Sequence, residues 1–313
     1  MIKNNKNKIF SSPYFPEKEK NMNIPMNYLP AFGKVFSPLV MNNLAEYGYS
    51  GYLSEVCSNS GVNIDTTKSV KQFLEDIYDI LQKNYRYEYV YKNVIANKIL
   101  LGKHSLKNAH MLTEFRVGKS KADVVILNGT STVYEIKSEY DSFVRLNQQI
   151  HSYLDIFDFI NVITTNSQAE KLKSLLPVSV GLLVLNKNNI ISTVRTAKSN
   201  INNIKLEILY ESLRKAEYTR IIKEYYGSLP VVPNTVLYKV CKTLFCQIPK
   251  KVAHTQVVKV LRERTNSETL RKFLTAAPDS MTAYAMSICM EKTRMEQLID
   301  RFELSVDSIM NTN

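Results

Sequence analysis

Cysteine and histidine are scarce in this chain. It has four of each among 313 residues, and no two cysteines form a Cys-x-x-Cys pair. A disulfide-stapled scaffold and a structural zinc site both need closely spaced groups of such residues. The sequence therefore predicts neither, and we interpret the cysteines as reduced, structural residues.

A long hydrophobic run is also missing. The longest apolar stretch, residues 180–185, is far shorter than the roughly 20 residues needed to span a bilayer. The N-terminal residues include lysines but no apolar segment behind them, which does not fit a secretory signal. We therefore expect a cytoplasmic protein that does not associate with a membrane.

Acidic residues are fewer than basic ones. The chain has 41 Lys and Arg against 29 Asp and Glu, which gives a net charge of +12. Such an excess favours a polyanionic partner, nucleic acid above all and an anionic membrane surface less so. At 44% hydrophobic residues, the chain can also bury a sizeable core.

Three regions follow one another along the chain. Residues 1–82 comprise an N-terminal arm rich in Asn, Lys and Pro and a helical extension, whose apolar spacing is clearest up to Leu81. Residues 83–198 predict a mixed α/β core. Residues 199–313 show amphipathic helical patterns and no further strand, so we expect an all-helical region there.

The period changes in the middle of the chain. Residues 111–117, 122–128 and 131–137 are short, β-branched segments bounded by turn residues, as is typical of three strands joined by hairpins. A helical pattern over 141–157 follows, with Asp141 or Ser142 as its cap. Strands near 160–164 and 178–185, separated by a helix over 168–176, complete the prediction of a mixed sheet with helices on both faces.

Asp123, Glu135 and Lys137 carry the chemical signal. Glu135 and Lys137 project from the same face of one strand because side chains alternate, and the hairpin brings Asp123 beside them. Converging carboxylates are hard ligands for Mg²⁺ or Mn²⁺, and a nearby lysine can assist an attacking water or offset phosphoryl charge. Charged strand residues are often only solvent-facing, but these interrupt strands that are otherwise apolar, where an unpaired charge is costly. The pattern favours phosphodiester hydrolysis.

These residues resemble those of the PD-(D/E)XK nuclease superfamily, whose core is helix, three-stranded meander, helix, strand. The resemblance implies a restriction-endonuclease-like fold in which Asp123, Glu135 and the carbonyl of Ile136 hold Mg²⁺ or Mn²⁺ while Lys137 assists the attacking water. Members similar to RecB add a Gln-x-x-x-Tyr motif on the next helix, which Gln149 and Tyr153 match. The segment also looks like an uncharacterised bacterial family assigned to this superfamily. One departure is that Ala122, and not Pro, precedes Asp123.

The superfamily adds a further acidic residue, and two candidates compete for that role. Glu88 precedes a predicted helix, whereas Glu114 lies in the first core strand. Lys119 and Lys121 lie beside the predicted pocket, where they either contact phosphate or belong to a solvated turn.

Basic residues accumulate between positions 239 and 272. Nine lysines and arginines stand there against two glutamates, an excess of seven, and Lys250, Lys251, Arg262 and Arg264 lie at its centre. Such helices suit docking onto DNA, although RNA fits the same charge. We therefore expect a metal-dependent deoxyribonuclease. The alternatives are an inactive nuclease fold that binds nucleic acid and a protein-interaction module with incidental charge.

Overall fold

The computed structural model describes residues 22–104, 108–264, 267–287 and 292–310. The start of the predicted arm, residues 1–21, and Cys289 lie outside these ranges. Cys57 and Cys241 are buried free thiols and Cys246 is half-buried, in agreement with a structural role. Within the described ranges, no helix is both long and apolar enough to cross a membrane.

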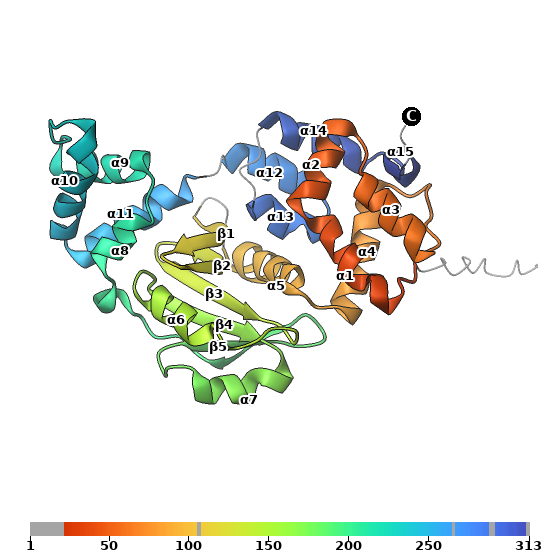
Figure 1. The fold of residues 1–313 in the computed structure, drawn as a ribbon, viewed down its shortest axis with the longest axis horizontal. Helices are drawn as coiled ribbons and strands as arrows, with labels where there is room; N and C mark the ends of the chain where they lie inside the picture. The colour runs from red at the N-terminus through yellow and green to blue at the C-terminus, as the bar shows by residue number, and fades with distance from the viewer. Residues whose placement is uncertain (1–21, 105–107, 265–266, 288–291, 311–313) are drawn as a thin grey trace, which may run out of the picture.

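A six-stranded sheet lies at the centre of the molecule (Figure 1). Its strands follow one another in sequence order, antiparallel from β1 to β3, parallel from β3 to β5, and antiparallel again at β6. The predicted mixed α/β class is therefore confirmed. The strands are β1 (His110–Val117), β2 (Ser120–Leu127), β3 (Ser131–Lys137), β4 (Phe159–Thr164), β5 (Gly181–Leu185) and β6 (Ile191–Arg195).

Two helices make the crossovers between the parallel strands. α6 (Leu146–Leu154) connects β3 to β4, and α7 (Asn166–Leu175) connects β4 to β5. The predicted start of the first helix was wrong, because α6 begins at Leu146 without a side-chain cap. Asp141 instead accepts hydrogen bonds from the backbone and hydroxyl of Ser138, which shape the loop ahead of the helix.

The edge strand β6 was not predicted. All five of its side chains are exposed or half-buried, so it lacks the apolar run that marks the interior strands. Its pairing with β5 forms through the backbone, which the side-chain pattern does not encode.

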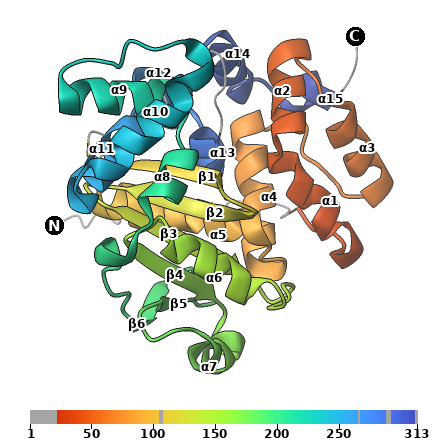
Figure 2. The same ribbon diagram turned by 60° about the vertical axis from the view of Figure 1, so that its left-hand side comes forward.

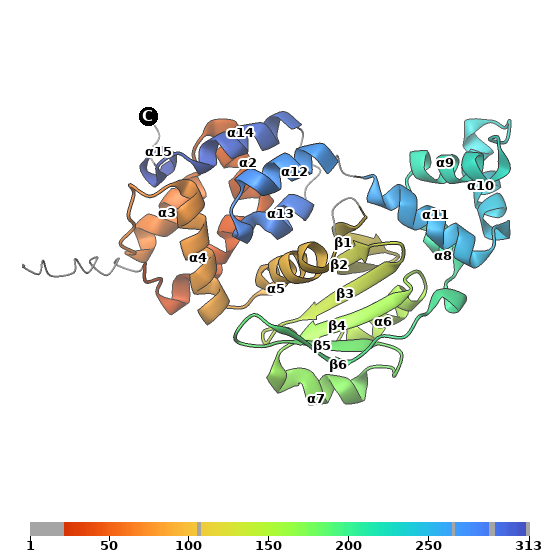
Figure 3. The ribbon, with the colours of Figure 1, turned by 180° about the vertical axis from the view of Figure 1, so that it is seen from behind.

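One face of the sheet packs against helices from both ends of the chain (Figures 1 and 3). α5 (Glu88–Ile95) and the π-helical segment η3 (Ala96–Leu101) lie next to the strands. Around them gather N-terminal and C-terminal helices that share a single core. These are α1 (Leu29–Gly33), α2 (Pro38–Tyr47), α3 (Gly51–Ser60), α4 (Val70–Asn84), α12 (Ser267–Ala276), α13 (Thr282–Ser287), α14 (Lys292–Phe302) and α15 (Val306–Met310).

The opposite face packs against α6, α7 and a second group of helices (Figure 2). This group is α8 (Leu206–Glu211), α9 (Lys215–Tyr226), α10 (Asn234–Gln247) and α11 (Lys250–Arg262). The helices of residues 199–313 are thus divided between the two faces of the sheet, with α8–α11 on one and α12–α15 on the other.

Candidate functional site

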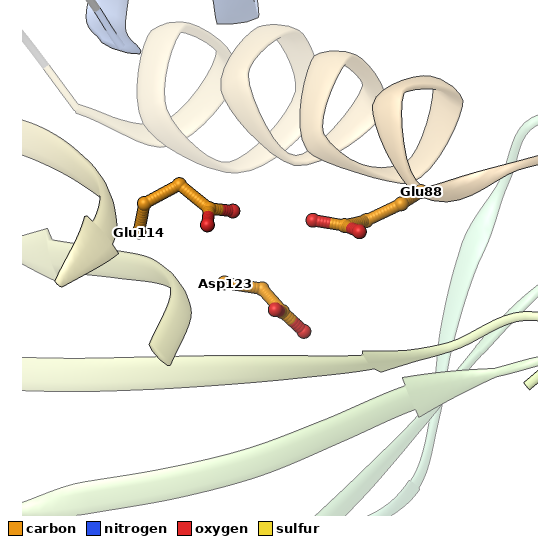
Figure 4. A group of neighbouring side chains, drawn as sticks. All are labelled: Glu88, Glu114 and Asp123. Carbon is orange, nitrogen blue, oxygen red and sulfur yellow. The ribbon is translucent and has the colours of Figure 1, made fainter. Parts of the chain in front are cut away.

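Three carboxylates meet where α5 crosses the β1–β2 pair. Glu88 begins α5, Glu114 comes from β1 and Asp123 from β2, and Figure 4 shows the Glu88 and Glu114 side chains pointing toward each other with Asp123 below them. One carboxylate oxygen of each lies within 4.8 Å of the others. Glu88 and Glu114, between which the sequence did not choose, therefore both reach Asp123. We call these three residues the acidic cluster.

A local distortion of β1 and β2 turns two of these side chains toward α5. Glu114 has a φ of 55°, a left-handed conformation that is uncommon outside glycine. Thr113 pairs with Val124, and Phe115 pairs with Ala122. In a regular strand Ala122 and Val124 would share a face, because they are two residues apart. Here Val124 packs into the core on one face and Ala122 into the core on the other. Strained backbone of this kind concentrates at functional sites.

Asp123 also joins β2 to β3. Its Oδ2 accepts a 2.7 Å hydrogen bond from the backbone N–H of Ile136. The N–H and C=O of one strand residue point to the same side of the strand, so the Ile136 carbonyl is directed toward Asp123 as well. Burial raises the pKa of Asp123 well above its usual range, and the negative charges of Glu135 and Glu88 raise it further.

Glu135 and Lys137 form a buried pair next to the acidic cluster. The Lys137 ammonium lies 2.8 Å from Glu135 Oε1 and donates a 3.0 Å hydrogen bond to Gln149 Oε1. The Tyr153 hydroxyl lies 2.7 Å from Glu135 Oε2 and 2.9 Å from the Lys121 carbonyl oxygen. Gln149 and Tyr153 are one turn apart on α6, so the helix presents both to β3. Among the described residues, Glu135 lies outside the acidic cluster, with both of its oxygens engaged.

Burial acts on the carboxyl group of Glu135. Glu135 is 1% exposed, and burial raises its pKa while the Lys137 ammonium and the Tyr153 hydroxyl act in the opposite direction. Removing one member would leave a buried charge without its partner. Glu135 and Lys137 therefore depend on each other, and Gln149 and Tyr153 contact this pair from α6.

Lys92 belongs to the site and was missed at the sequence level. The Lys92 ammonium lies 2.5 Å from Glu88 Oε1 and also contacts Glu114 Oε1. The other carboxylate oxygen of Glu114 contacts the Lys121 ammonium. Burial lowers the pKa of Lys92, but the two carboxylates outweigh it and the net shift is upward. The spacing of Glu88 and Lys92 by four residues on a helix was the available signal.

The donor set fits a hard divalent cation. It consists of three carboxylates, whose oxygens are the ligands that Mg²⁺ and Mn²⁺ prefer. Two lysines already gather around these oxygens, which shows that the cluster attracts positive charge.

The predicted nucleic-acid contacts fall in different environments. Lys119 is exposed in the β1–β2 turn and Lys251 is exposed on α11, whereas Lys250 donates to the Asn202 carbonyl at 3.0 Å. Arg264 is held in a buried pair with Glu217, with Nε 2.6 Å from Oε1, and we therefore assign it a packing role. Arg262, in the last turn of α11, stays a predicted contact together with the exposed lysines.

Comparisons with known proteins give one match of substantial length. No curated protein matches the chain. A solved protein of unknown function from Silicibacter pomeroyi is 19% identical, and the match covers 41% of this chain and 87% of that one at a TM-score of 0.27. The sequence profile of the family described as Bacteriophage P4 protein cII matches residues 81–287, about two thirds of the chain, from the end of α4 through the sheet and the acidic cluster to α13. The chain therefore belongs to the Bacteriophage P4 protein cII family.

Proposed function

We propose that the protein is a divalent-metal-dependent nuclease, with a PD-(D/E)XK-type core, that hydrolyses phosphodiester bonds in DNA. The observation that supports this most is the convergence of Glu88, Glu114 and Asp123 beside the buried Glu135–Lys137 pair. Exposed acidic groups often gather without a metal, but here a buried lysine and a strained strand accompany them. A phosphate-cleaving site needs that combination of anionic ligands and a cation at the reacting group.

Each residue has a distinct role in this proposal. Glu88, Glu114 and Asp123, with the Ile136 carbonyl, would hold Mg²⁺ or Mn²⁺, which when bound polarises a phosphate oxygen and activates water. Glu135 would join them once a cation competes for its oxygens. Lys137 orients the attacking water and offsets charge that develops on the phosphate, while Gln149 and Tyr153 hold Lys137 and Glu135 in place.

Two pockets open beside Glu114 of the acidic cluster. Each has a volume of about 350 Å³, and Thr113 and Glu114 line both. One is lined also by Arg116 and Arg214, whose guanidinium groups suit a phosphate backbone. The other is lined by Tyr87 and Tyr89, whose rings stack on each other with centroids 6.1 Å apart and pack against the helical core.

Cleavage assays with the full-length chain test the proposal. Supercoiled plasmid, linear duplex, single-stranded DNA and RNA would each be incubated with Mg²⁺, Mn²⁺ or chelator. We expect metal-dependent cleavage of DNA, reduced by roughly a hundredfold or more in Asp123→Asn and Glu135→Gln. Glu88→Gln and Glu114→Gln should each raise the Mg²⁺ concentration needed for half-maximal rate, because each removes one anionic ligand.

The control is Glu170→Gln, which makes the same chemical change at a carboxylate on α7 that is 85% exposed. It should cleave as the unmodified chain does. Cleavage that persists in chelator, or that survives in Asp123→Asn, would overturn the metal assignment. Salt-dependent binding of DNA without cleavage of any substrate would instead identify an inactive nuclease fold that binds nucleic acid.

A further inference from the structure

A separate pocket of about 580 Å³ lies on the α5 face of the sheet, toward β6. Thr132 and Tyr134 of β3, Phe159 and Asn161 of β4, and Thr193 of β6 line it. The register explains why they converge, since Thr132 pairs with Phe159 and Tyr134 with Asn161 on one face of adjacent parallel strands. No member of the acidic cluster and no residue of the Glu135–Lys137 unit lines this pocket.

Two nearly buried polar side chains face this pocket without a partner. Tyr134 and Asn161 are each 8% exposed, and within the described ranges neither the Tyr134 hydroxyl nor the Asn161 amide has a hydrogen-bond partner. Ile136 and Ile163 follow them on the same face of the two strands and belong to the hydrophobic core. Because both side chains line the pocket, their polar atoms are available to hydrogen-bond a ligand that enters it.

The backbone makes room for the Asn161 amide. A side chain at Gly181, its neighbour on β5, would place a Cβ 2.1 Å from Asn161 Oδ1. Only glycine fits at that position. The glycine therefore lets the Asn161 side chain lie against β5.

Positive charge lines the mouth of the pocket. Lys98, from the π-helical segment η3, and Lys103, just after it, are both exposed and both line the pocket, and no acidic residue does so. A π-helical turn inside a helix often marks a functional site. Uncompensated lysines beside an apolar floor of Ile99 and Leu183 suit a ligand that joins an anionic group to a flat ring.

The wall of the pocket is preformed. The β5–β6 turn contains Asn189 at a φ of 58°, and its amide donates to Gln82 Oε1 at 3.0 Å and accepts from Arg86. Gln82 lies in the last turn of α4 and Arg86 just after it, so the turn is fixed to the helical layer. A fixed wall lowers the entropy cost of binding.

We propose that this pocket binds a nucleoside monophosphate. Its ring lies between Phe159 and the apolar floor, the Asn161 amide and the Tyr134 hydroxyl hydrogen-bond to it, and Lys98 and Lys103 hold the phosphate. This site is independent of the proposed nuclease activity.

Calorimetric titration of the full-length chain tests the site. AMP, GMP, CMP and UMP are titrated in chelator, so that the acidic cluster cannot hold a metal-bound nucleotide. We expect at least one to bind, with the matching nucleoside and inorganic phosphate each at least tenfold weaker. Lys98→Gln with Lys103→Gln should lower nucleotide affinity at least tenfold, about 1.4 kcal/mol, and leave nucleoside affinity unchanged.

Thr193→Trp provides a second variant that fills the exposed mouth without changing charge, and it should abolish binding of nucleotide and nucleoside alike. Lys83→Gln with Lys173→Gln removes two exposed lysines elsewhere and should bind as the unmodified chain does. Absence of heat from all four nucleotides at millimolar concentration would overturn the proposal. Binding that the Lys98/Lys103 and Thr193 variants leave unchanged would overturn it equally.

Discussion

Lysine side chains reduce the repulsion between the carboxylates of the candidate site. Lys92 lies between Glu88 and Glu114, and Lys137 neutralises Glu135. Asp123 accepts its hydrogen bond from a backbone N–H, that of Ile136. Burial raises the pKa of Asp123, and the negative charges of Glu135 and Glu88 raise it further. This arrangement disfavours the ionised form of Asp123 until a further cation arrives.

Asp123→Asn should therefore stabilise the fold at pH 8 in chelator. A carboxyl group whose pKa is raised by folding is favourable while protonated, and the fold loses stability as pH rises from the unfolded pKa through the folded one. The amide removes that loss. Thermal unfolding should show a higher Tm for the variant at pH 8 than for the unmodified chain, and a smaller difference at pH 4. A lower Tm at pH 8 would contradict this reasoning.

Lys92→Met should make stability depend on Mg²⁺. Without the ammonium, Glu88 and Glu114 repel each other, so we expect a loss of about 1 kcal/mol in chelator, or roughly 2–4 °C in Tm. Saturating Mg²⁺ should restore most of that loss by supplying the missing positive charge. A variant whose Tm is equally low with and without Mg²⁺ would show that the carboxylates do not bind the ion.

Tyr153→Phe should shift the pH dependence of cleavage. The Tyr153 hydroxyl lowers the pKa of Glu135, so its removal raises that pKa and moves the acid limb of the rate profile to higher pH. The rate itself should fall by about 10–100-fold. Tyr210→Phe is the matched control, because it removes a buried hydroxyl that donates to the Tyr238 carbonyl and, within the described ranges, contacts no residue of the site. An unchanged profile in both variants would remove Tyr153 from the mechanism.

At the scale of elements, ion pairs connect the helices on the α6 face. Arg264, just after α11, pairs with Glu217 of α9, with side chains 13% and 11% exposed, and stacks over the Phe115 ring of β1 at 5.4 Å. Arg220 also joins α9 to the end of α11, through Glu263, but these side chains are 39% and 52% exposed. The two pairs link nearly the same elements at very different burial.

Arg264→Met should cost about 3–5 kcal/mol of unfolding free energy, because it strands the buried Glu217 carboxylate. Arg220→Met should cost about 1 kcal/mol or less, since water screens an exposed pair. Urea unfolding of both variants measures the difference. Equal losses of unfolding free energy in the two variants would mean that burial does not determine how much each ion pair contributes to stability.

At the scale of the whole molecule, the net charge is +12, and the lysines that contribute to it differ in whether they pair with an acidic side chain. Lys242 pairs with Glu211 and Lys259 with Glu224, so part of the basic excess on α10 and α11 is neutralised within the fold. In the part of the chain that the structure describes, Lys239, Lys250 and Lys251 have no acidic partner. These three are the better candidates for a DNA backbone.

Replacing Lys239, Lys250 and Lys251 with Gln should weaken binding to all DNA sequences alike. Each lost phosphate contact should reduce the slope of log affinity against log salt by about 0.9, so the slope should fall by up to roughly 2.7. A variant with Gln at Lys83, Lys173 and Lys292 removes the same charge elsewhere and should keep the slope. Equal slopes in the two variants would eliminate docking on α10 and α11.

The sequence by itself determined the order of the core elements and the residues that carry chemistry. Alternation within β3 places Glu135 and Lys137 on one face, and helical spacing places Gln149 and Tyr153 one turn apart, because local periodicity fixes which side chains share a face. Apolar patterns likewise located the interior strands. The exposed strand β6 escaped because backbone pairing leaves no such pattern.

Only the tertiary structure decided which distant residues meet. The left-handed turn at Glu114 and the crossing of α5 bring both glutamates to Asp123, and Lys92 between them followed from that packing. The amphipathic helices of residues 199–313 divided between two faces of the sheet, and Arg264 became a packing residue. The physical reason is twofold. An apolar stripe predicts that one face of a helix is buried, but it does not identify the element that buries it. The role of a charged side chain depends on the groups that folding places within a few ångströms of it.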